Sequence, residues 1–145
     1  MRRKETTLRA RPYKKLFTLA RNVVSCRLQM KIWLDDIRPA PDGYVWCKSV
    51  EEAKNTIVNA NAKFADQFIK GLEPDHSLHI DIIDLDYDAG DYANDGGDYI
   101  KLLDWLEWLY DGHGTYTEFH IHSMNPVGVA NMRAIIERNG WREIK

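Results

Sequence analysis

Short apolar blocks separated by turn residues recur along most of the chain. Residues 30–34 (MKIWL) and 44–47 (YVWC) are short apolar stretches typical of strands, and a segment with two prolines and a glycine separates them. Residues 78–85 (LHIDIIDL) predict a third strand, and residues 117–123 (TEFHIHS) a fourth, because apolar and polar positions alternate there. The terminal segment 141–145 (WREIK) is a candidate for one more short strand.

Helical spacing of apolar residues fills the gaps between these blocks. Ser49 followed by Glu52 is a capping-box pair, which predicts a helix from that point to Gly71. Because asparagine is a poor residue inside a helix, we expect an interruption near residues 59–61.

Two further helices are indicated by their end signals. Asp98 is the predicted cap of a helix that stops at Gly112. Asn125 and Pro126 are typical of the cap and the first position of the next helix, which ends at Gly140.

Strands that alternate with helices predict an α/β domain with a parallel sheet, right-handed crossovers and a tendency to three layers. The length of 145 residues suits one domain with a real core. No apolar run is long enough to span a bilayer, so we expect no membrane partner. Cys26 and Cys47 show no zinc-site spacing, which favours a reducing, cytoplasmic setting.

Charge divides the chain into two unequal parts. Residues 1–29 carry nine Lys/Arg and one acid, whereas residues 30–145 carry eleven Lys/Arg and 21 acids. We therefore expect a basic N-terminal extension followed by the domain. The extension is a nucleic-acid or membrane-seeking arm, a targeting peptide, or upstream sequence joined to a domain that begins at Met30. Any nucleic-acid contact is expected through residues 1–29 only.

Polar residues follow three of the predicted strands. Because parallel strands end at one edge of a sheet, these residues are expected to meet in one crevice, where such folds bind ligands. They are Asp35 and Asp36 after the first strand, Asp86 and Asp88 after the third, and His122, Ser123 and Asn125 after the fourth.

Crowded carboxylates repel one another unless they gain protons or a cation. An all-oxygen cluster suits a hard divalent ion such as Mg²⁺, which keeps waters and substrate phosphate among its ligands. A phosphate-containing ligand is therefore implied. A simpler interpretation stays open, in which Asp35 or Asp36 pairs with Arg38, the acidic loop at residues 86–98 (DYDAGDYANDGGD) is solvated or binds calcium weakly, and the strand histidines are packing residues.

The motifs LDDIRP, DLDYD and HSMNPVG resemble those of the cyclic-phosphate processing receiver domains of bacteria and phages. Members of that family typically start at a sequence like MKIWLDD, and the resemblance covers residues 30–140. It implies a receiver-like (flavodoxin-like) fold, with a parallel sheet of about four strands flanked by helices.

The resemblance also implies roles for individual residues. Asp35, Asp36 and Asp86 would hold Mg²⁺ or Mn²⁺, and Ser123 would touch the phosphoryl group. In a hydrolytic site, His122 would protonate a leaving oxygen or contact phosphate, and Asp88 would orient water. Receivers also need a lysine after a fifth strand, and here that lysine is the terminal Lys145 or is missing, which puts aspartyl-phosphate signalling in doubt.

Our first hypothesis is a metal-dependent phosphoesterase acting on cyclic or nucleotide-derived phosphates. The alternative is a receiver-like module that accepts a phosphoryl group on Asp86 or senses a nucleotide without turnover. A phage-encoded interaction protein with a vestigial site is a third possibility. A haloacid-dehalogenase phosphatase is disfavoured, because too little chain follows residue 86. The sequence gives no indication of oligomeric state.

Overall fold

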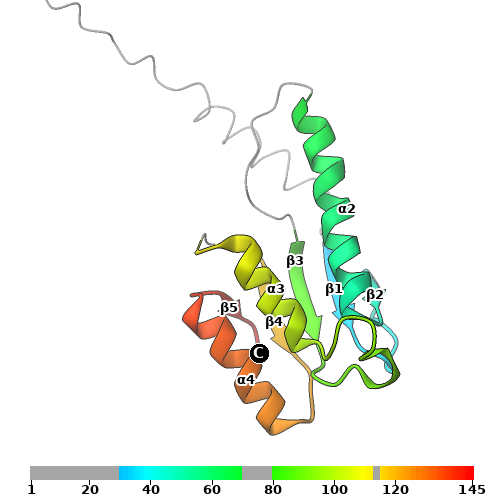
Figure 1. Ribbon diagram of the computed structural model, residues 1–145, viewed down its shortest axis with the longest axis vertical. Coiled ribbons are helices and arrows are strands. Elements are labelled where there is room, and N and C mark those ends of the chain that lie inside the picture. The colour runs from blue at the N-terminus through cyan, green and yellow to red at the C-terminus, as the bar shows by residue number, and fades with distance from the viewer. Residues whose placement is uncertain (1–29, 70–79, 113–114) are drawn as a thin grey trace, which may run out of the picture.

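The computed structural model describes residues 30–69, 80–112 and 115–145, with the backbone alone for residues 61–69. Its strands form one five-stranded sheet in the order β2-β1-β3-β4-β5, and every pair of neighbours is parallel (Figure 1). The strands are β1 (Met30–Leu34), β2 (Tyr44–Cys47), β3 (Ile80–Leu85), β4 (Glu118–Ile121) and β5 (Arg142–Glu143). The helices are α2 (Val50–Ile69), the 3-10 helix η1 (Gly90–Tyr92), α3 (Ile100–Tyr110) and α4 (Pro126–Arg138).

This architecture confirms the expected receiver-like α/β fold with a parallel sheet. Four strands were expected with a short fifth as a candidate, and β5 is present as that fifth strand. The connection from β1 to β2 is a turn-rich segment without a helix, whereas each later connection contains one.

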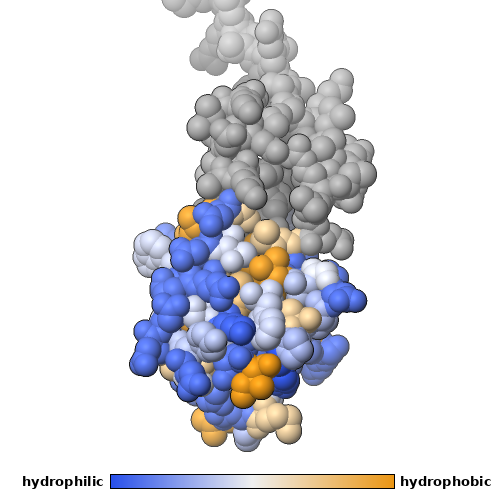
Figure 2. Space-filling model, turned by 90° about the vertical axis from the view of Figure 1, so that its right-hand side faces the viewer, coloured by the Kyte–Doolittle hydropathy of each residue, from blue (hydrophilic) through white to orange (hydrophobic). Residues whose placement is uncertain are grey.

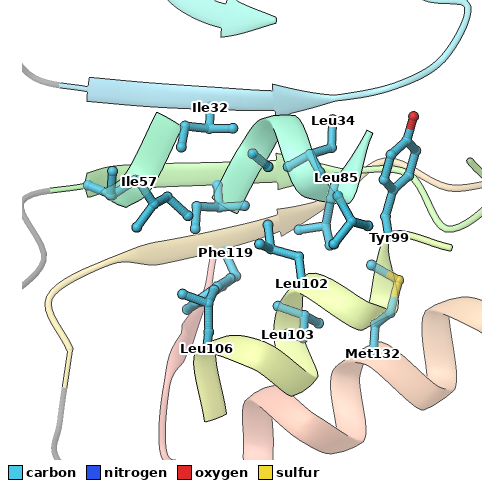
Figure 3. Packing of buried hydrophobic residues seen from close by; sticks show 14 of the residues in the cluster. Ile32, Leu34, Ile57, Leu85, Tyr99, Leu102, Leu103, Leu106, Phe119 and Met132 are labelled. Atoms are coloured by element: carbon cyan, nitrogen blue, oxygen red, sulfur yellow. The ribbon is translucent and has the colours of Figure 1, made fainter. Parts of the chain in front are cut away.

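The core lies on one face of the sheet. Alternate strand residues such as Ile32, Leu34 and Phe119 are fully buried, and they pack in a single cluster with residues of all three α-helices (Figure 3). The described helices therefore cover one face, and the expected second helical layer is absent from residues 30–69, 80–112 and 115–145.

The side chains that point away from this core form what we call the open face, defined by Lys31, Trp33, Asp84 and His120 on the strands and His122 just after β4. Trp33 and Trp46 are only partly buried, because strand alternation places them opposite the buried positions. The open face thus carries mainly aromatic, imidazole and charged side chains.

The helix ends test the capping predictions. Ser49 accepts a hydrogen bond from Glu52 N (3.0 Å), as the capping box predicts, and α2 continues without the expected interruption near residues 59–61. Asn125 caps α4 by accepting from Gly128 N (3.0 Å). The prediction that Asp98 caps α3 was wrong. Its Oδ1 instead accepts from Ala89 N (3.1 Å), and this hydrogen bond connects two points of the acidic loop.

The surface seen in Figure 2 is mostly hydrophilic, with hydrophobic residues scattered among polar ones. None of the helices in the described part of the chain combines the length and apolar character needed to cross a membrane. The three interpretations of residues 1–29 lie outside the described residues.

Candidate functional site

The ends of β1, β3 and β4 lie side by side at one edge of the sheet. Beyond the strands, Asp86 N donates to Leu34 O (3.0 Å) and His122 N donates to Leu85 O (3.1 Å). These bonds continue the ladder past the last strand residues, so the side chains that follow the strands lie at the same level.

The three carboxylates predicted to meet at this edge do so. One oxygen from each of Asp35, Asp36 and Asp86 lies within 4.8 Å of the other two. The expected convergence of separate strand ends is therefore present, and metal binding by these residues stays a prediction.

Asp35 is the most constrained of the three carboxylates, with a side chain only 1% exposed. Its Oδ1 accepts from the backbone N–H groups of Ile37 (2.9 Å) and Arg38 (2.6 Å). Its Oδ2 accepts from Arg38 Nε (2.6 Å) and lies 3.0 Å from His122 Nε2. Burial favours the neutral acid, but these hydrogen bonds outweigh it and lower the pKa of Asp35 below its ordinary value.

Arg38 joins two carboxylates of the cluster. Besides its bond to Asp35, its Nη2 donates to Asp86 Oδ2 (2.9 Å) and its Nη1 to His122 O (3.3 Å). The simpler interpretation, in which Arg38 pairs with one of the doubled aspartates, is thus correct for Asp35. The side chain is 46% exposed, so it remains accessible from solvent.

Asp36 has the least occupied carboxylate. No hydrogen bond or ion pair reaches it from the side chains of residues 30–60, 80–112 or 115–145, whereas Asp86 Oδ1 accepts from Tyr87 N (2.7 Å). Burial and the negative charges of Asp36, Asp35 and Asp86 all raise the pKa of the Tyr99 hydroxyl. Because the Arg38 guanidinium supplies one positive charge beside three carboxylates, the cluster keeps an excess of negative charge. This excess suits a divalent cation with oxygen ligands.

Comparison with protein-family models matched residues 30–138 to the cyclic-phosphate processing receiver domain. The chain belongs to this family. The comparisons with curated proteins and with solved structures gave no match.

Two other predicted site residues of this cyclic-phosphate processing receiver domain lie near the edge without joining the carboxylates. Ser123 Oγ accepts from Asn125 N (3.1 Å) at the turn into α4. Asp88 is exposed, and no contact recorded in the described parts of the chain engages its carboxylate. Their roles stay predictions.

His122 is fixed from three sides. Its Nδ1 lies 2.5 Å from Asp84 Oδ1, its Nε2 contacts Asp35, and its ring stacks on Trp33 at 3.9 Å between centroids with a 6° interplanar angle. Both ring nitrogens therefore face carboxylates, and neither is directed at an open position. An acid role for His122 stays a prediction that requires one of these contacts to open.

Sequence reasoning missed Asp84 and His120 as site residues. His120 Nδ1 lies 2.9 Å from Asp84 Oδ2, and the three side chains of Asp84, His120 and His122 form a second potential ligand group. The spacing of His120 and His122 already indicated that the two side chains lie on the same face, because residues two apart in a strand share a face. Finding their partner required the register, which pairs Asp84 with His120.

Proposed function

We propose that this receiver domain is a metal-dependent phosphoesterase that acts on cyclic or nucleotide-derived phosphates, with Mg²⁺ or Mn²⁺ as its cofactor. The observation that carries the proposal is the convergence of Asp35, Asp36 and Asp86 within 4.8 Å beside a partly exposed guanidinium. Carboxylates for a cation and an arginine for phosphate, placed together, match the two parts of a metal–phosphate substrate.

The contacts suggest separate tasks for the acidic residues. Asp36 and Asp86 are the direct ligands in this proposal, because their oxygens carry fewer donors than those of Asp35. Asp35 holds Arg38 in place through its Oδ2. A bound ion would neutralise phosphoryl oxygens and lower the pKa of a coordinated water.

Arg38 is the residue we assign to the phosphate. Its guanidinium is oriented by Asp35 and Asp86, and its exposed side remains open to a phosphoryl oxygen. Planar guanidinium groups bind phosphate with paired hydrogen bonds. We assign His122 to positioning Asp35, and keep Ser123 as a phosphoryl contact and Asp88 as the group that orients water.

The alternative is a receiver-like module that accepts a phosphoryl group on Asp86 or binds a nucleotide without turnover. The position of Asp86 favours it, because the residue follows β3 directly and lies beside Asp36 and Arg38. Against it, both oxygens of Asp86 already accept hydrogen bonds.

The test incubates the full chain with Mg²⁺ or Mn²⁺ and one of three probes: 2′,3′-cyclic nucleotides, cyclic dinucleotides or acetyl phosphate. Products are followed by chromatography and the protein by intact mass. Asp36→Asn removes one proposed ligand. Asp42→Asn is the matched control, because Asp42 is an exposed turn residue of the same type.

Metal-dependent opening of a cyclic phosphate that Asp36→Asn loses and Asp42→Asn keeps supports the phosphoesterase. A stable mass gain of one phosphoryl group, removed by Asp86→Asn, supports the phosphoacceptor instead. If neither signal appears and Mg²⁺ leaves the melting temperature unchanged, both proposals fail, since an ion that binds only the folded protein must stabilise it.

A further inference from the structure

The open face carries a nearly buried carboxylate whose neighbours are imidazoles. The Asp84 side chain is 8% exposed, and its recorded ion-pair partners in the described residues are His120 and His122, with no Lys or Arg among them. Each histidine takes a different oxygen of Asp84, at 2.9 Å and 2.5 Å from its Nδ1 atom. A carboxylate this well shielded from water needs hydrogen-bond donors or a bound cation beside it.

The two histidines reach Asp84 because of strand geometry. His120 lies on β4 and His122 two positions later, so both side chains project from the same face of the sheet. The parallel register pairs His120 with Asp84 on β3. The arrangement is therefore fixed by the sheet itself, and it does not depend on a loop.

The other nitrogen of His122 makes the contact expected of a metal-bound histidine. Its Nε2 lies 3.0 Å from Asp35 Oδ2, a carboxylate oxygen that also accepts from Arg38 Nε. Histidines that bind metals usually donate their second N–H to such a group, which fixes the ring orientation. A metal ion at Nδ1 would leave the Nε2 hydrogen free to be donated to Asp35, so both contacts of the ring are compatible with metal binding.

We propose that Asp84, His120 and His122 bind a divalent transition-metal ion, with Zn²⁺ as the representative ligand, at a site separate from the acidic cluster. Nitrogen ligands favour such ions over Mg²⁺. Tetrahedral binding with bonds near 2.0–2.2 Å places ligand atoms about 3.3 Å apart. The present ligand atoms lie within 4.8 Å of one another, and the closest pair, His122 Nδ1 and Asp84 Oδ1 at 2.5 Å, would move apart when an ion binds between them.

Solvent access and neighbouring contacts fit the same site. His120 is 35% exposed and His122 only 10%, so an ion would reach Asp84 from the His120 side and keep that side open to water. Trp33 covers the His122 ring by stacking. Through His122 Nε2 the ion would hold Asp35, and hence Arg38, in the arrangement described above.

The experiment titrates Zn²⁺ into the full metal-free chain by calorimetry and repeats the titration with Co²⁺, whose visible absorption reports coordination number. His120→Gln removes one ligand from a partly exposed position, so it is expected to leave the fold intact, as circular dichroism would check. His76→Gln is the control for loss of any histidine, and Asp36→Asn the control for the acidic cluster.

We expect one Zn²⁺ per chain, four-coordinate Co²⁺ bands, and an affinity loss of roughly ten-fold or more in His120→Gln, comparable to losing a supporting metal contact. Nitrogen-15 spectra should shift at Nδ1 of His120 and His122. His76→Gln and Asp36→Asn should bind as the wild type does. Equal binding by His120→Gln, loss in the His76→Gln control, or no Zn²⁺ binding by the wild type would overturn the proposal. Because no readout is activity, failure here leaves the phosphoesterase proposal intact.

Discussion

Arg38 Nε donates to Asp35 Oδ2 at 2.6 Å, and this contact defines the acidic edge of the sheet. The same guanidinium reaches Asp86, and both carboxylates raise the pKa of Arg38 against the opposing effect of burial. The protein thus supplies one fixed positive charge to its own carboxylate cluster. An incoming divalent ion has to share Asp86 with it.

Replacing Arg38 by Ala should therefore strengthen Mg²⁺ binding and weaken the binding of phosphate ligands. Two unit charges about 4 Å apart interact by about 1 kcal/mol in water and about 4 kcal/mol at an effective dielectric constant of 20, so a rise in Mg²⁺ affinity of about ten-fold is expected. Calorimetric titration measures both affinities. Arg142→Ala, on the exposed edge strand, changes net charge equally and should leave both unchanged. Weaker Mg²⁺ binding by Arg38→Ala would contradict this account.

Asp35 should make stability depend on acid pH. Because its folded pKa is lowered, its contribution is fully present above the ordinary carboxyl pKa of about 3.9 and is lost as the pH falls through the folded value. Asp35→Asn removes charged hydrogen bonds, so we expect its free energy of unfolding at pH 7 to fall by about 2–3 kcal/mol. Urea unfolding at pH 7 and pH 3 should show a smaller acid-induced loss in Asp35→Asn than in the wild type. An equal acid-induced loss of stability in Asp35→Asn and in the wild type would show that Asp35 does not cause the pH dependence. The control Asp42→Asn should lose as much stability in acid as the wild type does.

Much of the fold could be predicted from the sequence, because most elements have a local cause. The capping pair of Ser49 and Glu52 and the Asn125 cap can be recognised from residue types alone. The alternation of apolar and polar residues identifies the strands. The meeting of Asp35 with Asp86 also follows from topology, since all parallel strands end at one edge.

The remaining features could not be predicted from the sequence, because they depend on strand register and on contacts between distant residues. The pairing of Asp84 with His120 depends on how β3 and β4 align, which no local pattern states. Trp33 is large and apolar, as core residues often are, but strand alternation with Ile32 and Leu34 puts it on the open face. Asp98 looks like a helix cap, yet Ala89 N competes successfully for its carboxylate.

Gly128 in the first turn of α4 is expected to be intolerant of Ala. A Cβ there would lie 2.3 Å from Cγ of the Tyr87 ring, so the ring would have to move. Ala is the better helix former by about 1 kcal/mol, but overpacking costs about 1–3 kcal/mol, so we expect a net loss of up to about 2 kcal/mol in the free energy of unfolding. Chemical denaturation measures it. In a Tyr87→Ala background the same change should become stabilising, and a loss of equal size there would rule out the ring contact as the cause.

Gly90 offers the sharpest test of Asp36, because it contacts the carboxylate by backbone alone. A Cβ on Gly90 would lie 2.2 Å from Asp36 Oδ2, so Gly90→Ala must displace that oxygen from the cluster. The residue also has a positive φ of +52°, which an L side chain adopts at a cost of about 1 kcal/mol. Gly140 shares the positive φ, at +67°, but a Cβ on Gly140 would meet no atom within 4 Å, so Gly140→Ala isolates the backbone cost.

Both variants should therefore lose about 1 kcal/mol of stability, while only Gly90→Ala should also lose Mg²⁺ affinity. Denaturant unfolding and Mg²⁺ titration of the two proteins side by side measure the two effects separately. Equal Mg²⁺ affinity in both variants would mean that the Asp36 oxygen beside Gly90 does not bind the ion. In that case the proposed ligand pair of Asp36 and Asp86 would have to be abandoned, because Asp36 was chosen for the oxygens that no other described residue engages.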